Sequence, residues 1–542
     1  MTAPKPDQAN APSGSTAKIA RSAGAVGGAV MCSRVLGLIR EQLFAGLFGA
    51  GYAYDAFVVA FRIPNLLRDL FGEGALSAAF VTVFSDYDTN RGSQATWALA
   101  STVLIFFALL LSVLTLVGIY FAEPIVNLLA PDFASVAGKT LLTVKLTRIM
   151  FPFLFFVSLA AVVMGILNTK GRFFIPALAS SFFNLGSIVG GVSLALLFPL
   201  FAQPAIAGMA WGTLIGGALQ LGMQLPTLHK TGFRFSPRLR LKDPGLRRIL
   251  LLMLPATIGL SATQLNIFIN TNFAAGCAEG SVSWLNYAFR LVQLPIGVFG
   301  VALSIAVMPV MAKQAAAKRL DQLKQSFISS LILVFSLTIP ATLGLILLAE
   351  PIIRLIFEHG VFAASDTLMT AQALRYYALG LFAYSAIKIM VPVFYAINTT
   401  RYPVIGSFLG VAANLIIINL LIEQFQHRGI ALSTSAAMSC NFLFLGWVLI
   451  RKLEGLPLVY LARGVGKILL ATGVMAGGVW WLRELLQGWL HGSIPLQALA
   501  VFLLVATGGL SYGLCLQLLR LPELTLLTGK LAQRFSKAPS SS

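Results

Sequence analysis

The feature that most constrains this sequence is a set of long segments without any formal charge. Residues 173–229 contain no Asp, Glu, Lys or Arg, a length that suffices for two membrane-spanning helices and a tight turn. Residues 92–122, 325–349 and 429–450 each suffice for one more helix. The chain is 57% hydrophobic and 11% charged, whereas a typical soluble domain is about 25% charged. We therefore predict an all-α polytopic membrane protein, because the strands of a membrane barrel alternate apolar and polar residues.

The formal net charge of +20 would suggest nucleic-acid binding in a soluble protein. Here the basic residues lie in short loops between apolar segments, a pattern that sets membrane topology, and we expect no nucleic-acid partner. The four cysteines show no metal-ligand spacing, and we interpret them as small buried hydrophobic side chains. They are Cys32, Cys277, Cys440 and Cys515.

The apolar segments predict fourteen transmembrane helices, flanked by polar tails at residues 1–19 and 523–542 that we expect to be disordered and cytoplasmic. The approximate helix ranges are 20–48, 52–84, 95–122, 138–168, 173–200, 203–228, 246–275, 281–312, 322–348, 366–397, 402–424, 428–450, 463–487 and 494–520. Loops after even-numbered helices are rich in Lys and Arg, and loops after odd-numbered helices hold few. The positive-inside rule therefore places both termini in the cytoplasm.

Three pairs of similar segments indicate an internal duplication. AEPIVNLLAPDF resembles AEPIIRLIFEHG, AFRIPNLLRDLFGEGALS resembles AFRLVQLPIGVFGVALS, and NTKGRFFIPALASSFFNL resembles NTTRYPVIGSFLGVAANL. The pairs begin at Ala122 and Ala349, Ala60 and Ala288, and Asn168 and Asn398. Each separation spans six helices, an even number, so both halves cross the membrane in the same sense and are related by a pseudo-two-fold axis along the membrane normal.

The duplication predicts two six-helix lobes, residues 20–228 and 246–455, joined by a basic cytoplasmic linker at residues 229–245. Two additional helices follow within residues 456–522. A two-lobed helical protein with a site between its lobes is typical of alternating-access transporters.

Charged residues gather inside the first, second and eighth predicted helices. Each costs roughly 2.5–3.5 kcal/mol near the bilayer centre, so such residues normally face a cavity or a partner. They are Arg34, Arg40, Glu41, Asp55, Arg62, Arg68, Asp69, Glu73 and Arg290. Helical spacing places Arg34 and Glu41 on one face and Asp55, Arg62 and Asp69 on another.

A surplus of guanidinium groups in a cavity suits an anionic ligand, because Arg binds phosphate through two parallel hydrogen bonds and stays protonated. We predict a phosphate-binding cavity lined by Arg34, Arg40, Arg68 and Arg290, with Asp55, Glu41, Asp69 and Glu73 as supporting acids. The alternative is a structural salt-bridge network that joins the helices, and Arg62 fits both interpretations. Further candidates for the cavity or a gate are Ser33, Asn65 and Lys388.

No GxSxG, HExxH or Walker motif is present, and the four histidines lie in loops or near helix ends. We therefore expect a transporter without enzymatic activity, cofactor or metal. Ion gradients, membrane potential or substrate supply would drive it, a monovalent cation being one candidate coupling ion.

Four segments carry a family resemblance: SRVLGLIRE, DAFVVAFRIPNLLRDLFGEGALSAAFV, ILNTKGRF and GSVSWLNYAFRLVQLPIGVFGVAL. Over residues 20–520 the chain resembles the MurJ (MviN) lipid II flippases of bacteria, in the multidrug/oligosaccharidyl-lipid/polysaccharide (MOP) exporter superfamily. The resemblance implies fourteen helices, the inner membrane, and transfer of the undecaprenyl-diphosphate-linked peptidoglycan precursor to the outer leaflet.

The resemblance also implies roles for individual residues. The family's cavity arginines correspond to Arg34, Arg40, Arg68 and Arg290, and its helix-two acid corresponds to Asp55. In the family these residues engage the diphosphate and sugar headgroup or support the groups that do. The last two helices form a groove for the polyprenyl tail.

The expected function is lipid II flipping by alternating access, with membrane lipids and other cell-wall synthesis proteins as further partners. A flippase for another polyprenyl-diphosphate glycan fits the same residues. A drug or cation exporter of the superfamily would favour a cavity dominated by acids. A membrane glycosyltransferase would need a catalytic carboxylate in a sizeable outer loop, and a scaffold for cell-wall enzymes would not need buried arginines.

Overall fold

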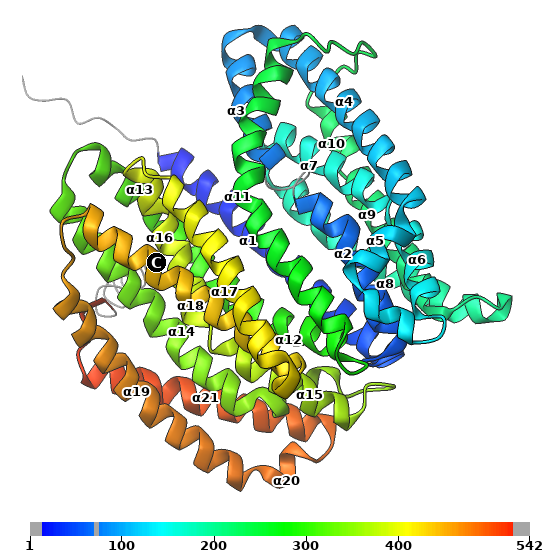
Figure 1. Cartoon of the computed structure of the whole chain (residues 1–542). Coiled ribbons are helices and arrows are strands. Elements are labelled where there is room, and N and C mark those ends of the chain that lie inside the picture. Colours follow the sequence, from blue (N-terminus) through cyan, green and yellow to red (C-terminus); the bar gives the residue numbers. More distant parts are fainter. Residues whose placement is uncertain (1–12, 70–74, 524–542) are drawn as a thin grey trace, which may run out of the picture. The chain divides into compact units, whose positions relative to one another are not determined.

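The computed structural model describes residues 13–69 and 75–523, which form helices joined by turns and loops (Figure 1). The chain divides into two compact units. Unit 1 comprises Met1–Leu43, Ala60–Ile125 and Leu141–Leu260, and unit 2 comprises Phe44–Val59, Val126–Thr140 and Ser261–Ser542. Two short segments of the first half of the sequence therefore belong to the unit that contains the second half.

The helices that lie wholly or largely in unit 1 are α1 (Ser13–Phe48), α2 (Tyr52–Arg68), α3 (Ala75–Asn90), α4 (Gly92–Tyr120), α6 (Lys139–Met150), α7 (Phe153–Thr169), α8 (Phe174–Leu197), α9 (Ala205–Gly222), α10 (Leu225–Lys230) and α11 (Pro244–Ala275), with a 3₁₀ turn, η3 (Phe198–Phe201). The last part of α1, the first part of α2 and the end of α11 pass into unit 2.

The other helices belong wholly or largely to unit 2. They are α5 (Ala122–Leu129), α12 (Ser281–Pro295), α13 (Ala302–Ala316), α14 (Leu320–Phe357), α15 (Ala364–Ala378), α16 (Leu381–Ala396), α17 (Arg401–Phe425), α18 (His427–Lys452), α19 (Leu458–Leu485), α20 (Gln487–Leu490) and α21 (Ile494–Leu518), with a 3₁₀ turn, η2 (Pro131–Ser135), and a π-helical turn, η4 (Ile296–Val301).

The described residues contain ten helices long and apolar enough to cross a membrane, or up to twelve if each of two bent helix pairs is one span. The bent pairs are the two halves of α11, before and after Pro255, and α15 with α16. The structure is thus an all-helical polytopic membrane protein. The predicted count of fourteen transmembrane helices additionally requires that α1 and the α2–α3 segment cross the membrane.

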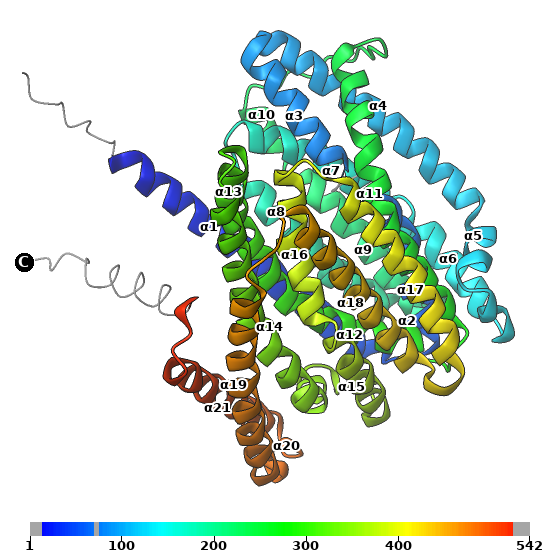
Figure 2. The ribbon, with the colours of Figure 1, turned by 60° about the vertical axis from the view of Figure 1, so that its left-hand side comes forward.

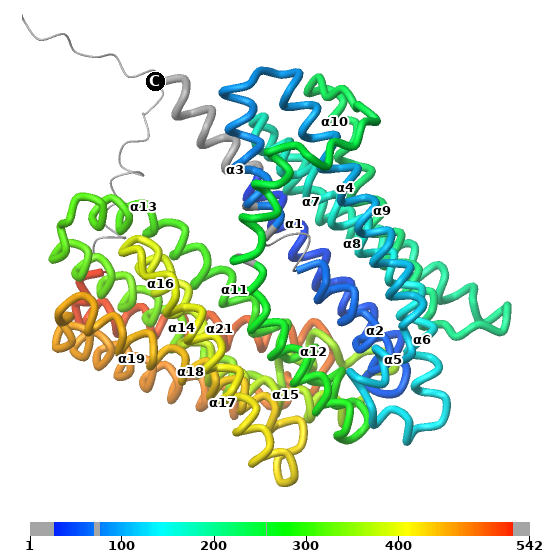
Figure 3. The backbone as a smooth tube through the Cα atoms, turned by 45° about the horizontal axis from the view of Figure 1, so that its top comes forward, coloured from blue at the N-terminus to red at the C-terminus, as the bar shows by residue number. Residues whose placement is uncertain are grey.

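Close helix packing in unit 1 depends on small residues. A side chain at Gly208, Gly212 or Gly216 of α9 would collide with the backbone of α8, so these glycines allow the two helices to touch along their length. The apolar core beside them is formed by α3, α4 and α7, which lie together in Figure 3. It includes Phe80, Phe84 and Phe107.

In unit 2 the core lies among α14, α16 and α18, and α19 and α21 pack against α14 (Figures 1 and 2). Gly464 of α19 lies against Ile332 of α14, so α19 approaches α14 closely at this point. The outer faces of α19 and α21 expose large apolar residues such as Trp481 and Phe502, as expected for helices surrounded by lipid.

One polar contact recurs in both sequence repeats. Asn184 of α8 donates a hydrogen bond to the carbonyl oxygen of Ser33 in α1, 3.0 Å away. Its repeat mate, Asn414 of α17, donates to Asn270 of α11 over 2.8 Å, and Asn270 donates to Thr434 of α18. In each repeat an asparagine of the fifth predicted helix thus binds the first one, as expected for polar residues that join transmembrane helices.

Two expectations differ from the structure. Cys32 and Cys440 are exposed rather than buried, because they lie on outward faces of α1 and α18, where an apolar thiol suits lipid as well as a protein core. Helix α1 begins at Ser13, within the predicted disordered tail, since the sequence STAKIARSA consists largely of helix formers. Residues 1–12 and 524–542 of the predicted tails lie outside the described residues.

Candidate functional site

Arg40 and Glu41 form a buried ion pair in α1. Arg40 Nη2 lies 2.7 Å from Glu41 Oε1, and the two side chains are 9% and 6% exposed. The guanidinium carbon of Arg40 also lies 5.3 Å from the centre of the Phe183 ring of α8. A buried charge is tolerated when a partner of opposite sign is this close, so Glu41 stabilises Arg40 inside unit 1.

One turn and a half earlier in α1, Ser33 and Arg34 have different surroundings. Ser33 faces α8, where the side-chain amide of Asn184 lies 3.5 Å from its hydroxyl oxygen. The side chain of Arg34 is exposed and takes part in none of the ion pairs among the described residues. Binding of an anion by this guanidinium would therefore break no ion pair among the described residues.

Helix α2 presents Arg62, Asn65 and Arg68 at partly buried positions of unit 1, and the partly buried Asp69 follows its last residue. Arg68 donates from both Nε and Nη2 to one oxygen of Asp69, over 3.2 and 2.9 Å. Asp69 therefore offsets part of the positive charge of Arg68. The predicted supporting acid Glu73 lies outside the described residues.

Asp55, at the start of α2, has a different set of partners, all within unit 2. Its carboxylate lies 3.0 Å from Lys139 Nζ and accepts hydrogen bonds from the backbone N–H of Gly280 and of Ser283, over 2.9 and 3.0 Å. The Ser283 hydroxyl donates a further bond of 2.5 Å. Asp55 is 1% exposed and Lys139 is 2% exposed, so this is a buried carboxylate whose oxygens are fully hydrogen-bonded.

The contact with Asp55 replaces a missing helix cap. Helix α12 begins at Ser281, after Gly280 with φ of +94°, and it has neither an acid in its first turn nor a local side-chain cap. The first N–H groups of a helix lack intrahelical partners and attract negative charge. Asp55 supplies that charge from another helix, and Lys139 at the start of α6 supplies the compensating positive charge.

Further contacts surround Asp55 at this end of unit 2. The backbone N–H of Tyr52 donates to Glu279 over 2.9 Å, and the Tyr54 ring stacks on Tyr287 with ring centres 4.8 Å apart. The Tyr287 hydroxyl donates to the carbonyl oxygen of Gly49. These contacts attach the turn between α1 and α2 to α12.

Arg290 lies on the same helix as Ser283, nearly two turns further on, and is partly buried. Its neighbour Phe289 packs against the rings of Tyr377 and Tyr384. Lys388 of α16 is exposed, and its ammonium group belongs to none of the ion pairs among the described residues. Its carbonyl oxygen accepts a hydrogen bond from the hydroxyl of Ser304.

A sequence model of the family described as "Lipid II flippase MurJ" matches residues 44–500. This chain belongs to the MurJ family. The family resemblance that the sequence predicts is thereby confirmed.

Curated MurJ relatives are similar over most of their length. A probable lipid II flippase MurJ of Buchnera aphidicola subsp. Acyrthosiphon pisum is 35% identical over 486 residues, 89% of this chain and 94% of that protein. The lipid II flippase MurJ of Burkholderia cenocepacia is 38% identical over 432 residues, 78% of this chain and 82% of that protein.

Two solved structures are similar to this chain, one of the same family and one of a related fold. A lipid II flippase MurJ in an inward closed conformation shares 28% identity, with a TM-score of 0.76, over 94% of this chain and 99% of that one. An inward-facing multidrug MATE transporter of the MOP superfamily is 16% identical, with a TM-score of 0.67, over 78% of this chain and 95% of that one. The second likeness concerns the fold alone and places the MurJ fold beside that of MATE transporters.

The sequence analysis missed Lys139, Gly280 and Ser283 as partners of Asp55. Lys139 lies at the start of the helix predicted over residues 138–168, and the other two lie 225 and 228 residues from Asp55 in the chain. One sequence feature could have indicated the contact. The segment GSVS at 280–283 starts a helix that has no acid in its first turn. A helix start of this kind needs an acceptor from elsewhere in the fold.

Proposed function

We propose that this MurJ-family chain is a lipid II flippase, which transfers the undecaprenyl-diphosphate-linked peptidoglycan precursor from the inner to the outer leaflet of the bacterial cytoplasmic membrane. The family match over residues 44–500 carries this conclusion, and the curated relatives, which cover most of the chain, support it. The protein is accordingly a transporter and not an enzyme.

The topology that accompanies this function has fourteen helices, with both termini in the cytoplasm. Twelve spans correspond to the helices and bent pairs of sufficient length and hydropathy, and α1 and the α2–α3 segment provide the other two. The excess of Lys and Arg in alternate loops supports this orientation. The two sequence repeats act as lobes that alternate in exposing the substrate, and α19 and α21 accommodate the polyprenyl tail.

The arginines hold the diphosphate during transfer. Arg34, Arg40, Arg62 and Arg68 belong to unit 1, and Arg290 belongs to unit 2. Arg34 is exposed and belongs to no ion pair among the described residues, and guanidinium groups bind phosphate oxygens in pairs of hydrogen bonds. Glu41 and Asp69 keep Arg40 and Arg68 in place between transport cycles, since each acid contacts its arginine directly.

The contacts of Asp55 provide a releasable closure for the same cycle. They bind the start of α2 to the start of α12 through charge-assisted hydrogen bonds. Alternating access requires an end of the protein to open and close, and a small set of polar contacts can break and re-form where an interdigitated apolar core cannot.

Reconstitution of the purified chain in vesicles tests the function. Fluorescent lipid II is placed in one leaflet, and its arrival in the other is followed by a membrane-impermeant quencher, beside a polyprenyl-diphosphate lipid with a different sugar. We expect faster transfer of lipid II than in protein-free vesicles. Transfer of only the other glycan lipid would favour the alternative flippase, and transfer of neither, by chain shown to be folded, would refute the proposal.

A further inference from the structure

A pocket of about 420 Å³ opens between α14, α15 and the start of α18 in unit 2. Its described lining is Ile346, Gln372, Arg375, Tyr376, Leu379 and Arg428. Helix α15 contacts both α14 and α18. None of the residues assigned above to substrate binding lies in it, so this pocket is a separate feature.

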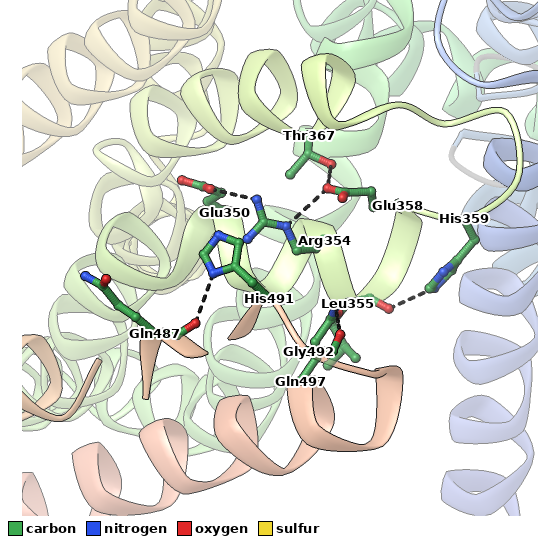
Figure 4. Close-up of polar contacts among 10 residues, drawn as sticks. All are labelled: Glu350, Arg354, Leu355, Glu358, His359, Thr367, Gln487, His491, Gly492 and Gln497. Carbon is green, nitrogen blue, oxygen red and sulfur yellow. Dashed lines mark hydrogen bonds and ion pairs between the residues drawn. The ribbon is translucent and has the colours of Figure 1, made fainter. Parts of the chain in front are cut away.

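The charge of the pocket is unbalanced. Two of its six lining residues are arginines and none is acidic, and among the described residues neither Arg375 nor Arg428 forms an ion pair. Arg354 of α14 shows the usual arrangement, because it lies between Glu350 and Glu358, 3.0 and 3.3 Å away (Figure 4). A partly buried pair of guanidinium groups without acids is unfavourable unless an anion can enter.

The local fold positions the backbone of Arg375 and the side chain of Arg428. Arg375 and Tyr376 lie in the last turn of α15, which ends before the 41° bend to α16. The Ser435 hydroxyl binds the freed carbonyl of Tyr376 over 2.7 Å. Arg428 donates from Nε to the carbonyl oxygen of Phe425 over 3.3 Å, which leaves its two terminal nitrogens for a ligand.

The side chains define the chemistry of the ligand. Positions 372, 375, 376 and 379 share one face of α15, so an amide, a guanidinium, a phenol and an apolar group line one wall. Two guanidinium groups with polar neighbours can donate paired hydrogen bonds to the oxygens of a phosphate ester. The pocket volume is in the range of small-molecule sites. The apolar residues Ile346 and Leu379 suit the first carbon atoms of a lipid attached to that phosphate.

We propose that Arg375 and Arg428 form a second phosphate-binding site, which takes the phosphate ester of a membrane lipid. A membrane phospholipid and a polyprenyl diphosphate present the same phosphate chemistry, and the experiment separates these two sources. The site does not depend on the flippase function, because it is argued from its own pocket and its own charges.

Binding is measured by thermal stabilisation of the full chain in an uncharged maltoside detergent. Three probes are titrated: phosphatidylglycerol, a short-chain polyprenyl diphosphate and inorganic phosphate, with diacylglycerol as the phosphate-free reference. We expect Arg375→Ala and Arg428→Ala each to weaken binding of at least one lipid probe by about ten- to hundredfold. Arg375→Lys keeps the positive charge but loses the planar guanidinium group that makes paired hydrogen bonds. It should therefore weaken binding less than Arg375→Ala does.

Arg238→Ala is the matched control, because it removes an exposed arginine from the loop between α10 and α11, outside the pocket, and should leave every affinity unchanged. The probe whose affinity falls identifies the lipid source. Unchanged affinities in both pocket variants, an equal loss in Arg238→Ala, or arginine-dependent binding of inorganic phosphate alone would each overturn the proposal. Because the readout is binding rather than transfer, its outcome is independent of the flipping assay.

Discussion

Ser283 binds the carboxylate of Asp55 twice, through its backbone N–H at 3.0 Å and through its hydroxyl at 2.5 Å. The two residues are 228 positions apart, close to the spacing of the sequence repeat, so corresponding regions of the two repeats meet at this point within unit 2. The contact satisfies the first turn of α12 and gives Asp55 a structural role in the closed end of that unit.

Asp55→Ala should therefore destabilise the protein strongly. The substitution removes the carboxylate that lies 3.0 Å from the buried ammonium of Lys139, and breaking a buried ion pair typically costs about 3–5 kcal/mol. Ser283→Ala should cost less, about 1.5–3 kcal/mol, because only the hydroxyl bond is lost. Thermal unfolding in detergent measures both.

The double variant Asp55→Ala with Lys139→Met serves as the control for this prediction. Because it removes both buried charges, it should be more stable than Asp55→Ala alone. A double variant less stable than the single one would show that Lys139 acts through contacts other than Asp55.

Glu41→Ala should also destabilise the protein, since it leaves the buried Arg40 without its carboxylate. Asp86→Ala is the matched comparison: Asp86 pairs with Arg248 over 2.8 Å, but that pair is largely exposed. Exposed pairs contribute about 0–1 kcal/mol, whereas breaking a buried pair costs several. Equal losses in the two variants would contradict the burial argument.

Arg34→Ala and Arg290→Ala should abolish lipid II transfer while leaving membrane insertion intact. Arg34 is exposed, so its removal opens no cavity, and the loss should appear as a lower transfer rate and not as lower yield. Vesicle transfer measures the rate and membrane fractionation measures insertion. Full transfer by both variants would remove these arginines from the site.

Gly360→Ala should destabilise unit 2 by at least about 1–2 kcal/mol. Gly360 has φ of +60°, and a side chain there would collide with the carbonyl of Gly46. Its neighbour Val361 binds that same carbonyl over 2.9 Å. Gly466→Ala in α19 is the control, since it has open space around it and should be neutral or stabilising. Thermal unfolding of both variants decides the comparison.

Cys277, in the loop between α11 and α12, should react slowly with maleimide. Burial, with the nearby Asp132 carboxylate, raises the pKa of its thiol to about 11, above the usual value of about 8.5. Only the thiolate reacts, so the labelling rate of a variant with Cys277 as its single cysteine should still rise about tenfold per pH unit between pH 8 and 10. Free cysteine levels off near pH 9, and the same plateau in the protein would contradict the raised pKa.

The helical class and the arrangement in repeats followed from the sequence because both depend on local or periodic signals. Apolar length alone marks a membrane helix, and the three repeated segments mark the duplication. The polar role of Asn184 and Asn414 was predictable for the same reason, since a polar side chain in a membrane helix usually bonds to a neighbouring helix.

The partners of the charged residues did not follow. Helical spacing grouped Asp55 with Arg62 and Asp69, yet Asp55 binds Lys139 and α12, and Asp69 binds Arg68. Arg40 likewise binds its neighbour in sequence, Glu41. Long side chains reach partners off their own helical face, and Asp55 is directed by the unpaired N–H groups of a helix that begins more than 200 residues later. The spacing of residues along one helix shows neither how far a long side chain reaches nor where another helix begins in the fold.

The shared carboxylate also has a consequence for biosynthesis. Ribosomes make Asp55 first, then Lys139 84 residues later, and finally Gly280, 225 residues after Asp55. The second helix is therefore synthesised with an acid whose eventual hydrogen-bond donors do not yet exist. The contact set around Asp55 can consequently be completed only after translation has reached Ser283.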